Sequence, residues 1–220
     1  MSPTPPRANL SGVRAPKQER SQRSFDRVLD CTLELLGEKG YAGFTLTEVS
    51  RRSGVSVGSI YTRVDGKDEL LRAAQARFHD HMLEVGSQLT DPARWEGAGL
   101  GELLPGLVAE FSVLLQREGK VLGAFQQRGA IDEDVARLGK AEYLDMRERF
   151  TALLLTRRDD IGHPDPERAV ISCFTTVYAV LARALALDVA PTAAEGSDLP
   201  VLVEDLGSMC LAFLHHTARP

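Results

Sequence analysis

The sequence predicts an all-α fold in two parts: an N-terminal three-helix domain that contains a helix-turn-helix, and a larger helical domain after it. Apolar residues recur at helical spacing along nearly the whole chain, and no alternating run of useful length predicts a β-strand. Breaks that contain Gly or Pro separate the apolar stripes, at 90–99, 117–120, 161–166 and 190–198. With 220 residues, 43% of them hydrophobic, the chain can bury a sizeable core.

Residues 1–19 are rich in Pro, Arg and Ser, which predicts a disordered basic leader. The first 27 residues hold six basic and two acidic side chains, although the whole chain has a net charge of −5. A basic arm on an acidic body is typical of a protein with one end that meets phosphate, and an ordinary solvated tail is the alternative. The leader has no apolar signal-peptide core, and three widely spaced cysteines suit a reducing compartment, so we expect a cytoplasmic protein.

The first helix is predicted over 23–39, where an apolar stripe runs from Phe25 to Leu36. Gly40 follows this stripe and suits the left-handed conformation that commonly ends a helix. Thr45 then begins a T-x-x-E capping box, which predicts that the next helix starts one residue later.

The stretch "SGVSVGSIYTRVDGKDEL", residues 53–70, has the order expected of a helix-turn-helix. Gly54 supplies the tight turn, and Ser56 caps a second short helix. Val55 and Ile60 should point back toward the preceding helix, which leaves the other face of the short helix outward. A plain helical hairpin is the alternative.

Residues 20–75 resemble the DNA-binding domain of the tetracycline-repressor (TetR) family, through "GYAGFTLTEVS" and "SGVSVGSIYTRVDGKDEL". The resemblance implies a bacterial regulator of transcription, with a DNA-binding domain at 20–66 and a ligand-binding and dimerisation domain at 67–220. It implies a homodimer that places the helix at 56–63 in the major groove of a double-stranded palindromic operator. The chain departs from the family pattern at Val64, where an aromatic residue is usual, so we expect a looser junction there.

Side-chain chemistry gives each exposed residue of this motif an expected role. Hydroxyl groups, a lysine and helix N-termini suit phosphate, whereas small groups near the start of the short helix suit base edges. Gly58, which lacks a Cβ, would allow close approach to the groove. We expect phosphate contacts from Thr45, Thr47, Arg51, Ser56, Tyr61 and Lys67, base contacts from Val57, Ser59 and Thr62, and either kind from Arg63.

The last two long helices, at about 165–189 and 199–216, carry more apolar residues than a surface helix needs. Ile171, Ala179 and Ala186 lie off the main stripe, which indicates a second buried face. We expect this face to form the homodimer, and a deep intramolecular core is the alternative. The apolar segment 169–187 is interrupted by Arg183 and polar residues, so we expect no membrane span.

The resemblance also implies a small-molecule effector that binds between about 75 and 190 and releases the DNA. The candidates for this pocket are bulky side chains that the apolar stripes of the helices do not require. The alternative is that they belong to the ordinary hydrophobic core. Sparse charge around 169–187 favours an apolar or aromatic ligand. The candidate pocket residues are Trp95, Phe111, Phe125, Tyr143, Phe174 and Tyr178.

No pattern in the sequence points to catalysis, to a cofactor or to a metal site. His79 and His81 are two residues apart and so face different sides of a helix, unlike an i, i+4 metal pair. We therefore expect a regulator and not an enzyme. A protein of the same fold that regulates through a protein partner, with little DNA binding, is the alternative function.

Overall fold

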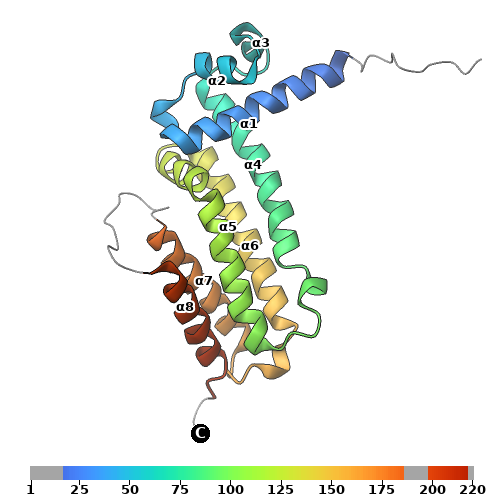
Figure 1. The fold of residues 1–220 in the computed structure, drawn as a ribbon, viewed down its shortest axis with the longest axis vertical. Helices are drawn as coiled ribbons and strands as arrows, with labels where there is room; N and C mark the ends of the chain where they lie inside the picture. The colour runs from blue at the N-terminus through green and yellow to red at the C-terminus, as the bar shows by residue number, and fades with distance from the viewer. Residues whose placement is uncertain (1–16, 186–197, 218–220) are drawn as a thin grey trace, which may run out of the picture.

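The computed structural model describes residues 17–185 and 198–217, and these residues form helices with no strand among them (Figure 1), which confirms the all-α prediction. Two short 3-10 helices, η1 and η2, join the longer ones. The helices are α1 (Lys17–Gly43), α2 (Leu46–Ser53), α3 (Val57–Tyr61), α4 (Lys67–Leu89), η1 (Pro92–Trp95), α5 (Leu100–Gly129), α6 (Glu133–Leu155), η2 (Arg158–Asp160), α7 (Pro166–Ala184) and α8 (Leu199–Leu214).

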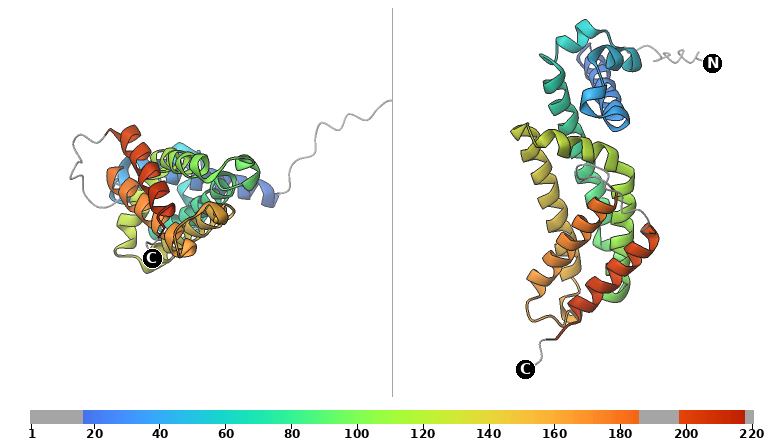
Figure 2. Two further views of the ribbon diagram at one scale, coloured as in Figure 1. Left: turned by 90° about the horizontal axis from the view of Figure 1, so that it is seen from below. Right: turned by 90° about the vertical axis from the view of Figure 1, so that its left-hand side faces the viewer.

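Helices α1 to α3 form a head at one end of an elongated molecule, and α4 runs from this head into a body made with α5 to α8 (Figures 1 and 2). Helix α5 packs against α1, α6 and α8, so it connects the head to both sides of the body. Helices α7 and α8 lie side by side on one face of the body. The head therefore touches the body through α1 and α4.

Helix α1 begins at Lys17, inside the stretch expected as a leader, and the rest of that stretch lies outside the described residues. The predicted stop at Gly40 appears as a break in the helical backbone, because Gly40 has a φ of 66°. A short turn, Tyr41–Gly43, follows it. This glycine conformation directs the chain from α1 into α2.

Helix α5 runs without interruption from Leu100 to Gly129, so the break expected at 117–120 is wrong. A glycine inside a helix costs only about 1 kcal/mol, and burial of flanking residues such as Leu115 and Phe125 outweighs that cost. Pro105 also lies inside α5, where Gly207 of α8 crosses it closely. A Cβ at Gly207 would lie 3.1 Å from the Pro105 Cα.

Buried apolar side chains form a continuous core through head and body. In the head, Phe44 and Ile60 are fully buried, and Val64 is 3% exposed, so the smaller residue at the family's aromatic position is still enclosed. None of the helices in the described ranges is long and apolar enough to cross a membrane.

Candidate functional site

Two hydroxyl side chains and one glycine define the helix-turn-helix in the head. The Thr45 Oγ1 accepts a hydrogen bond from the Glu48 backbone N–H at 3.2 Å, and the Ser56 Oγ accepts one from Ser59 at 3.2 Å. Both predicted N-caps are therefore formed. Gly54, with a φ of 70°, ends α2 in the left-handed region that favours glycine. Local sequence thus fixes how α3 leaves α2.

The short helix α3 is anchored by one side and open on the other. Ile60 is fully buried against the head, while Tyr61 is 53% exposed. Most residues expected to meet DNA are accessible: Thr45, Thr47, Arg51, Ser56, Gly58, Ser59, Tyr61, Thr62 and Arg63 are exposed, and Val57 and Lys67 are half-buried.

Packing inside the protein gives no reason for a glycine at position 58. A Cβ built on Gly58 would have no atom of the chain within 4 Å, apart from its own helix backbone and neighbours. Its φ is not in the left-handed region either, so the backbone conformation does not require glycine. Among the described residues, neither packing nor backbone conformation therefore requires glycine at position 58.

Arg63 links α3 to α1 in this conformation. Its Nη2 donates a 2.6 Å hydrogen bond to Ser21 Oγ, and its guanidinium lies 5.3 Å from the centre of the Phe25 ring. Thr62 bonds back to its own helix, because its Oγ1 donates to the Ser59 carbonyl at 2.7 Å. Arg63 and Thr62 can thus bind an external partner through polar atoms that these bonds leave unused, or by giving up the bonds to Ser21 and Ser59.

Lys67, the first residue of α4, packs on two aromatic rings of the head. Its ammonium lies 4.3 Å from the ring centre of Tyr41 and 4.4 Å from that of Phe44, within cation–π range. Partial burial lowers the pKa of Lys67 below its ordinary value. The lysine thereby fixes the start of α4 against the head, and its contact with phosphate stays a prediction.

A second cation on the Tyr41 ring ties the head to the turn between α5 and α6. The Arg128 guanidinium lies 4.2 Å from the Tyr41 ring centre and donates a 3.0 Å hydrogen bond to Asp68, which also accepts from the Tyr41 hydroxyl. On the next turn of α4, Arg72 pairs with Asp132 at 3.1 Å. These contacts join the end of α1 and the start of α4 to the α5–α6 turn.

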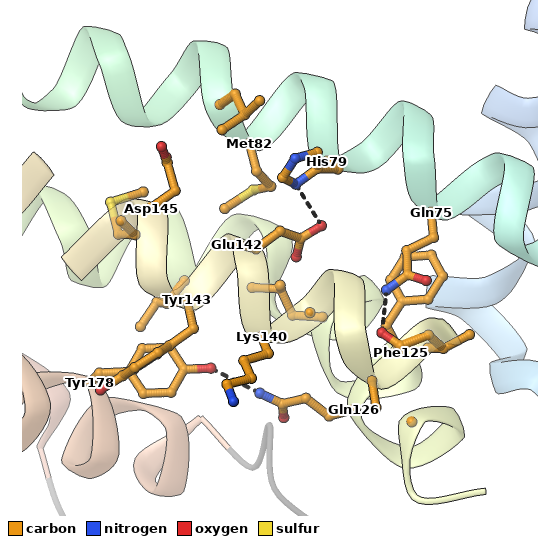
Figure 3. Close-up of a pocket in the computed structure, with 18 of the residues that line it drawn as sticks. Gln75, His79, Met82, Phe125, Gln126, Lys140, Glu142, Tyr143, Asp145 and Tyr178 are labelled. Carbon is orange, nitrogen blue, oxygen red and sulfur yellow. Dashed lines mark hydrogen bonds and ion pairs between the residues drawn. The ribbon is translucent and has the colours of Figure 1, made fainter. Parts of the chain in front are cut away.

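A cavity of about 260 Å³ lies in the body between α4, α5, α6 and α7 (Figure 3). Much of its wall is aromatic, and the ring centre of Tyr143 lies 5.5 Å from that of Phe174 and 5.0 Å from that of Tyr178. Gly129 and Val135, at the α5–α6 turn, line one end. Five predicted pocket residues line this cavity: Phe111, Phe125, Tyr143, Phe174 and Tyr178.

Six polar side chains also line the cavity: Gln75, His79, Gln126, Lys140, Glu142 and Asp145. His79 Nδ1 of α4 lies 3.5 Å from Glu142 Oε1 of α6, and burial raises the pKa of Glu142 to about 7. The Gln126 amide donates a 2.9 Å hydrogen bond to the Tyr178 hydroxyl. Gln75 instead donates to the backbone of Val135 at 3.0 Å, which joins α4 to the start of α6.

Trp95 does not line this cavity, which corrects its assignment as a pocket residue. Its indole N–H donates to the Leu89 carbonyl at 3.1 Å, and its ring lies against Gly106, where a Cβ would come within 2.8 Å of it. The bulky side chain packs the connection between α4 and α5 against α5. Trp95 is therefore a packing residue of that connection.

Residues 28–74 match the family model described as bacterial regulatory proteins, tetR family. The matched range covers most of α1, the whole helix-turn-helix and the start of α4, where the capped turns and the exposed short helix lie. The head is therefore similar to the DNA-binding part of TetR-family regulators.

Curated regulators are similar to this chain over part of their length. The regulator SrpR of Pseudomonas putida is 31% identical over 77 residues, which are 34% of this chain and 36% of SrpR. The uncharacterized regulator TtgW, also of Pseudomonas putida, is 34% identical over 77 residues, 34% of this chain and 58% of TtgW. The matches thus span about a third to somewhat over half of these relatives.

Solved structures extend the TetR fold over the body. A putative TetR-family regulator from Mesorhizobium loti superposes with a TM-score of 0.73 over 89% of this chain and 96% of its own, at 17% identity. A putative transcriptional regulator from Pseudomonas aeruginosa gives 0.62 over 91% and 90%, at 21% identity. At these identities the likeness establishes the fold of the body and nothing about its ligand.

Sequence reasoning missed the polar residues of the cavity in the body. Gln75 was detectable, because it interrupts the apolar stripe of α4 between Leu71 and Phe78 and is 1% exposed. Glu142 and His79 gave no such signal, since a charged residue beside an apolar stripe is ordinary on a surface helix. No cluster of His, Cys, Asp and Glu suited to a metal occurs within residues 17–185 and 198–217.

Proposed function

We propose that this protein is a DNA-binding transcriptional repressor that binds a palindromic operator as a homodimer and releases it when a small ligand fills the body cavity. The observation that carries the proposal is the open face of α3. Gly58 and Ser59 are exposed there, and a Cβ at Gly58 would meet no atom of the chain. Such a protein would act in the bacterial cytoplasm, where the chromosome lies.

The head offers the polar groups that operator recognition needs. Hydroxyls of Thr45, Thr47 and Ser56 lie near the N-termini of α2 and α3, where backbone N–H groups also suit phosphate. Ser59 in α3 and Thr62 just after it are exposed, which supports contacts with base edges. Ile60 is the buried residue of α3, so the opposite face of this helix stays available for DNA.

The dimer is supported by exposed apolar side chains on the face formed by α7 and α8 (Figure 2, right). Val201 and Met209 are 52% and 64% exposed, and Ile171 on α7 is 38% exposed. Ser172 and Thr175 donate their hydroxyl hydrogens to their own helix, which reduces the polarity of that face. Exposed apolar side chains on two neighbouring helices support an interaction surface, which a second copy would cover symmetrically.

The oligomeric state tests this part of the proposal. Met209→Glu should convert the dimer to a monomer, measured by light scattering coupled to size-exclusion chromatography, because it would bury a charge at the interface. Val113→Glu is the matched control, since Val113 is 62% exposed on α5, away from α7 and α8. A wild-type chain that is monomeric at micromolar concentration would exclude the dimer.

Release by a ligand is supported by the position of α4. This helix lines the cavity with His79 and Met82, and its first residue, Lys67, packs on the head. A ligand that moves α4 or the α5–α6 turn would change the contacts of Arg128 with Tyr41 and Asp68 and so tilt the head. Two linked sites with a rigid element between them give the coupling that allosteric release needs.

Selection of bound DNA from random sequence tests the DNA-binding part of the proposal. We expect the full-length chain to select a palindrome, with half-sites spaced by about one helical turn of roughly 34–36 Å or slightly more. Ser59→Ala and Thr62→Ala should then change base preference, while Thr47→Ala should weaken all sites by a similar factor. Failure to select any sequence at physiological salt, without ligand, would refute operator binding.

A further inference from the structure

A carboxyl group lines the cavity with one buried oxygen that makes no hydrogen bond within the described part of the chain. The Glu142 side chain is 11% exposed, and its Oε1 is buried with no hydrogen-bond partner in the described structure (Figure 3). The nearest polar group, His79 Nδ1, lies 3.5 Å away and is itself buried without a hydrogen bond. A buried acceptor left in this state is costly, so a donor brought by a ligand would bind strongly here.

A second acceptor lies on the same cavity wall. Gln126 uses its amide nitrogen to donate to Tyr178, which leaves its Oε1 acceptor buried and without a partner. Gln126 and Glu142 come from α5 and α6, and both point into the cavity (Figure 3). Two unused oxygen acceptors indicate a ligand that carries hydrogen-bond donors.

The aromatic walls favour a flat ligand with a positive charge. Tyr143, Phe174 and Phe111 form a cluster of rings in mutual contact, with centroids 5.5 Å apart for Tyr143 and Phe174 and 5.7 Å apart for Phe111 and Phe174, and this cluster lines the cavity. Aromatic faces attract cations and also stack on flat apolar groups. A volume of about 260 Å³ suits a molecule of one or two fused rings with a short side chain.

We propose that the cavity binds an arylalkylamine or similar organic cation, with its charged nitrogen at the Glu142 carboxylate and its flat body against the aromatic wall. This inference rests on the proposed function only in treating the cavity as an effector site. Gln126 Oε1 would accept a second hydrogen bond from the same ligand.

Other charged groups at the cavity do not favour an anion over a cation. Lys140 is exposed, so water satisfies its ammonium without a ligand. Asp145 already pairs with Arg149 at 2.7 Å. A carboxylate ligand would have to place its negative charge near Glu142, and like charges at short distance repel.

Three probes of equal shape and different charge test the proposal: 1-naphthylmethylamine, 1-naphthylmethanol and 1-naphthoate. Their affinities for the full-length chain are measured by isothermal titration calorimetry at pH 8. We expect the amine to bind at least about tenfold more tightly than the alcohol, and the naphthoate to bind most weakly. Glu142→Gln should remove the preference for the amine and leave the affinity for the alcohol unchanged.

Glu148→Gln is the matched control, because Glu148 is an exposed carboxylate on the same helix. It should leave all three affinities unchanged. Gln126→Leu should weaken amine binding by a smaller factor, which keeps the test valid if Glu142→Gln misfolds. Tighter binding of naphthoate, equal binding of amine and alcohol, or no binding of any probe at millimolar concentration would overturn the proposal.

DNA selection is measured separately, with the ligand-free chain. A chain that selects an operator and ignores the cation would defeat this inference and leave the proposed function intact. A chain that binds the amine through Glu142 but selects no DNA would defeat the proposed function and leave this inference intact.

Discussion

The head and the cavity place their functional groups in opposite ways. In the head, polar groups stand exposed on short helices, positioned by hydrogen bonds that span three residues, such as Ser56 to Ser59. In the cavity, buried side chains from four helices meet, as His79 and Glu142 do across 63 positions of sequence. Substitutions on the surface of the head should therefore separate recognition from stability, whereas substitutions in the cavity should change both.

The largest effect should come from the anchor of the recognition helix. Ile60→Ala removes a fully buried side chain from a small core, which should cost about 2–5 kcal/mol of local stability and abolish DNA binding. Hydrogen exchange should accelerate in α2 and α3 while the amides of α5 to α7 keep their protection. Equal acceleration of exchange in head and body would show that the two regions unfold as one unit, and that the head is not independently stable.

In the cavity, Glu142 should make stability depend on pH. Burial raises its pKa to about 7, above the usual value of roughly 4.3, so the folded chain keeps a proton that the unfolded chain loses. The stabilisation is complete below about pH 4 and disappears as the pH rises through about 7, with a total of roughly 3 kcal/mol.

The free energy of urea unfolding is measured from pH 4 to pH 8 for wild type and for Glu142→Gln. The difference, wild type minus variant, is then followed as a function of pH. His79, Lys140 and Asp145 face the same cavity, but they occur in both proteins, so the difference isolates Glu142. Glu148→Gln, on the surface of the same helix, should give a flat difference. A difference that rises with pH would contradict the burial argument, since it would mean that donors stabilise the charged carboxylate.

A substitution at Gly58 should separate recognition from stability in the head. Gly58→Val should weaken operator binding by about 1–3 kcal/mol, because a side chain there would hold α3 away from the groove. The unfolding temperature should stay the same, since a Cβ at Gly58 meets no atom of the chain. Gly101→Val, another open position in a helix, is the matched control and should leave both quantities unchanged. Unchanged operator affinity would refute the close-approach argument.

The head could be predicted from sequence because each of its features is local. Thr45, Gly54 and Ser56 act through bonds or backbone angles within four residues, so residue type and spacing are sufficient. The same reasoning failed at 117–120, where Gly119 favours a break locally and burial against other helices keeps α5 continuous.

The cavity could be predicted only as a set of bulky residues. Bulk predicted five of its aromatic residues, but also Trp95, which packs elsewhere, because size does not tell which helices a side chain will face. The pairing of Glu142 with His79 depends on how α4 and α6 pack, and no spacing along the chain encodes that distance. The charge selectivity of the site therefore became visible only in three dimensions.

The smallest predicted effect compares two threonines at the start of α2. Thr45 is both an N-cap and an expected phosphate contact, whereas Thr47 is exposed and expected to contact phosphate alone. Thr45→Ala should lower stability by about 1 kcal/mol and also weaken DNA binding, while Thr47→Ala should only weaken binding. Thr45→Ser keeps a capping hydroxyl and should restore most of the stability.

Chemical denaturation and salt-dependent DNA titration of these three variants separate the two roles. If the hydroxyl of Thr45 serves only the cap, Thr45→Ala will lose stability while its affinity extrapolated to the folded state stays that of wild type. If Thr47→Ala instead proves as destabilising as Thr45→Ala, the Thr47 side chain packs against the head in solution, contrary to its exposed position in the structure. Equal weakening of DNA binding by both alanine variants, with loss of stability in only one, is the result that places both hydroxyls at the DNA backbone.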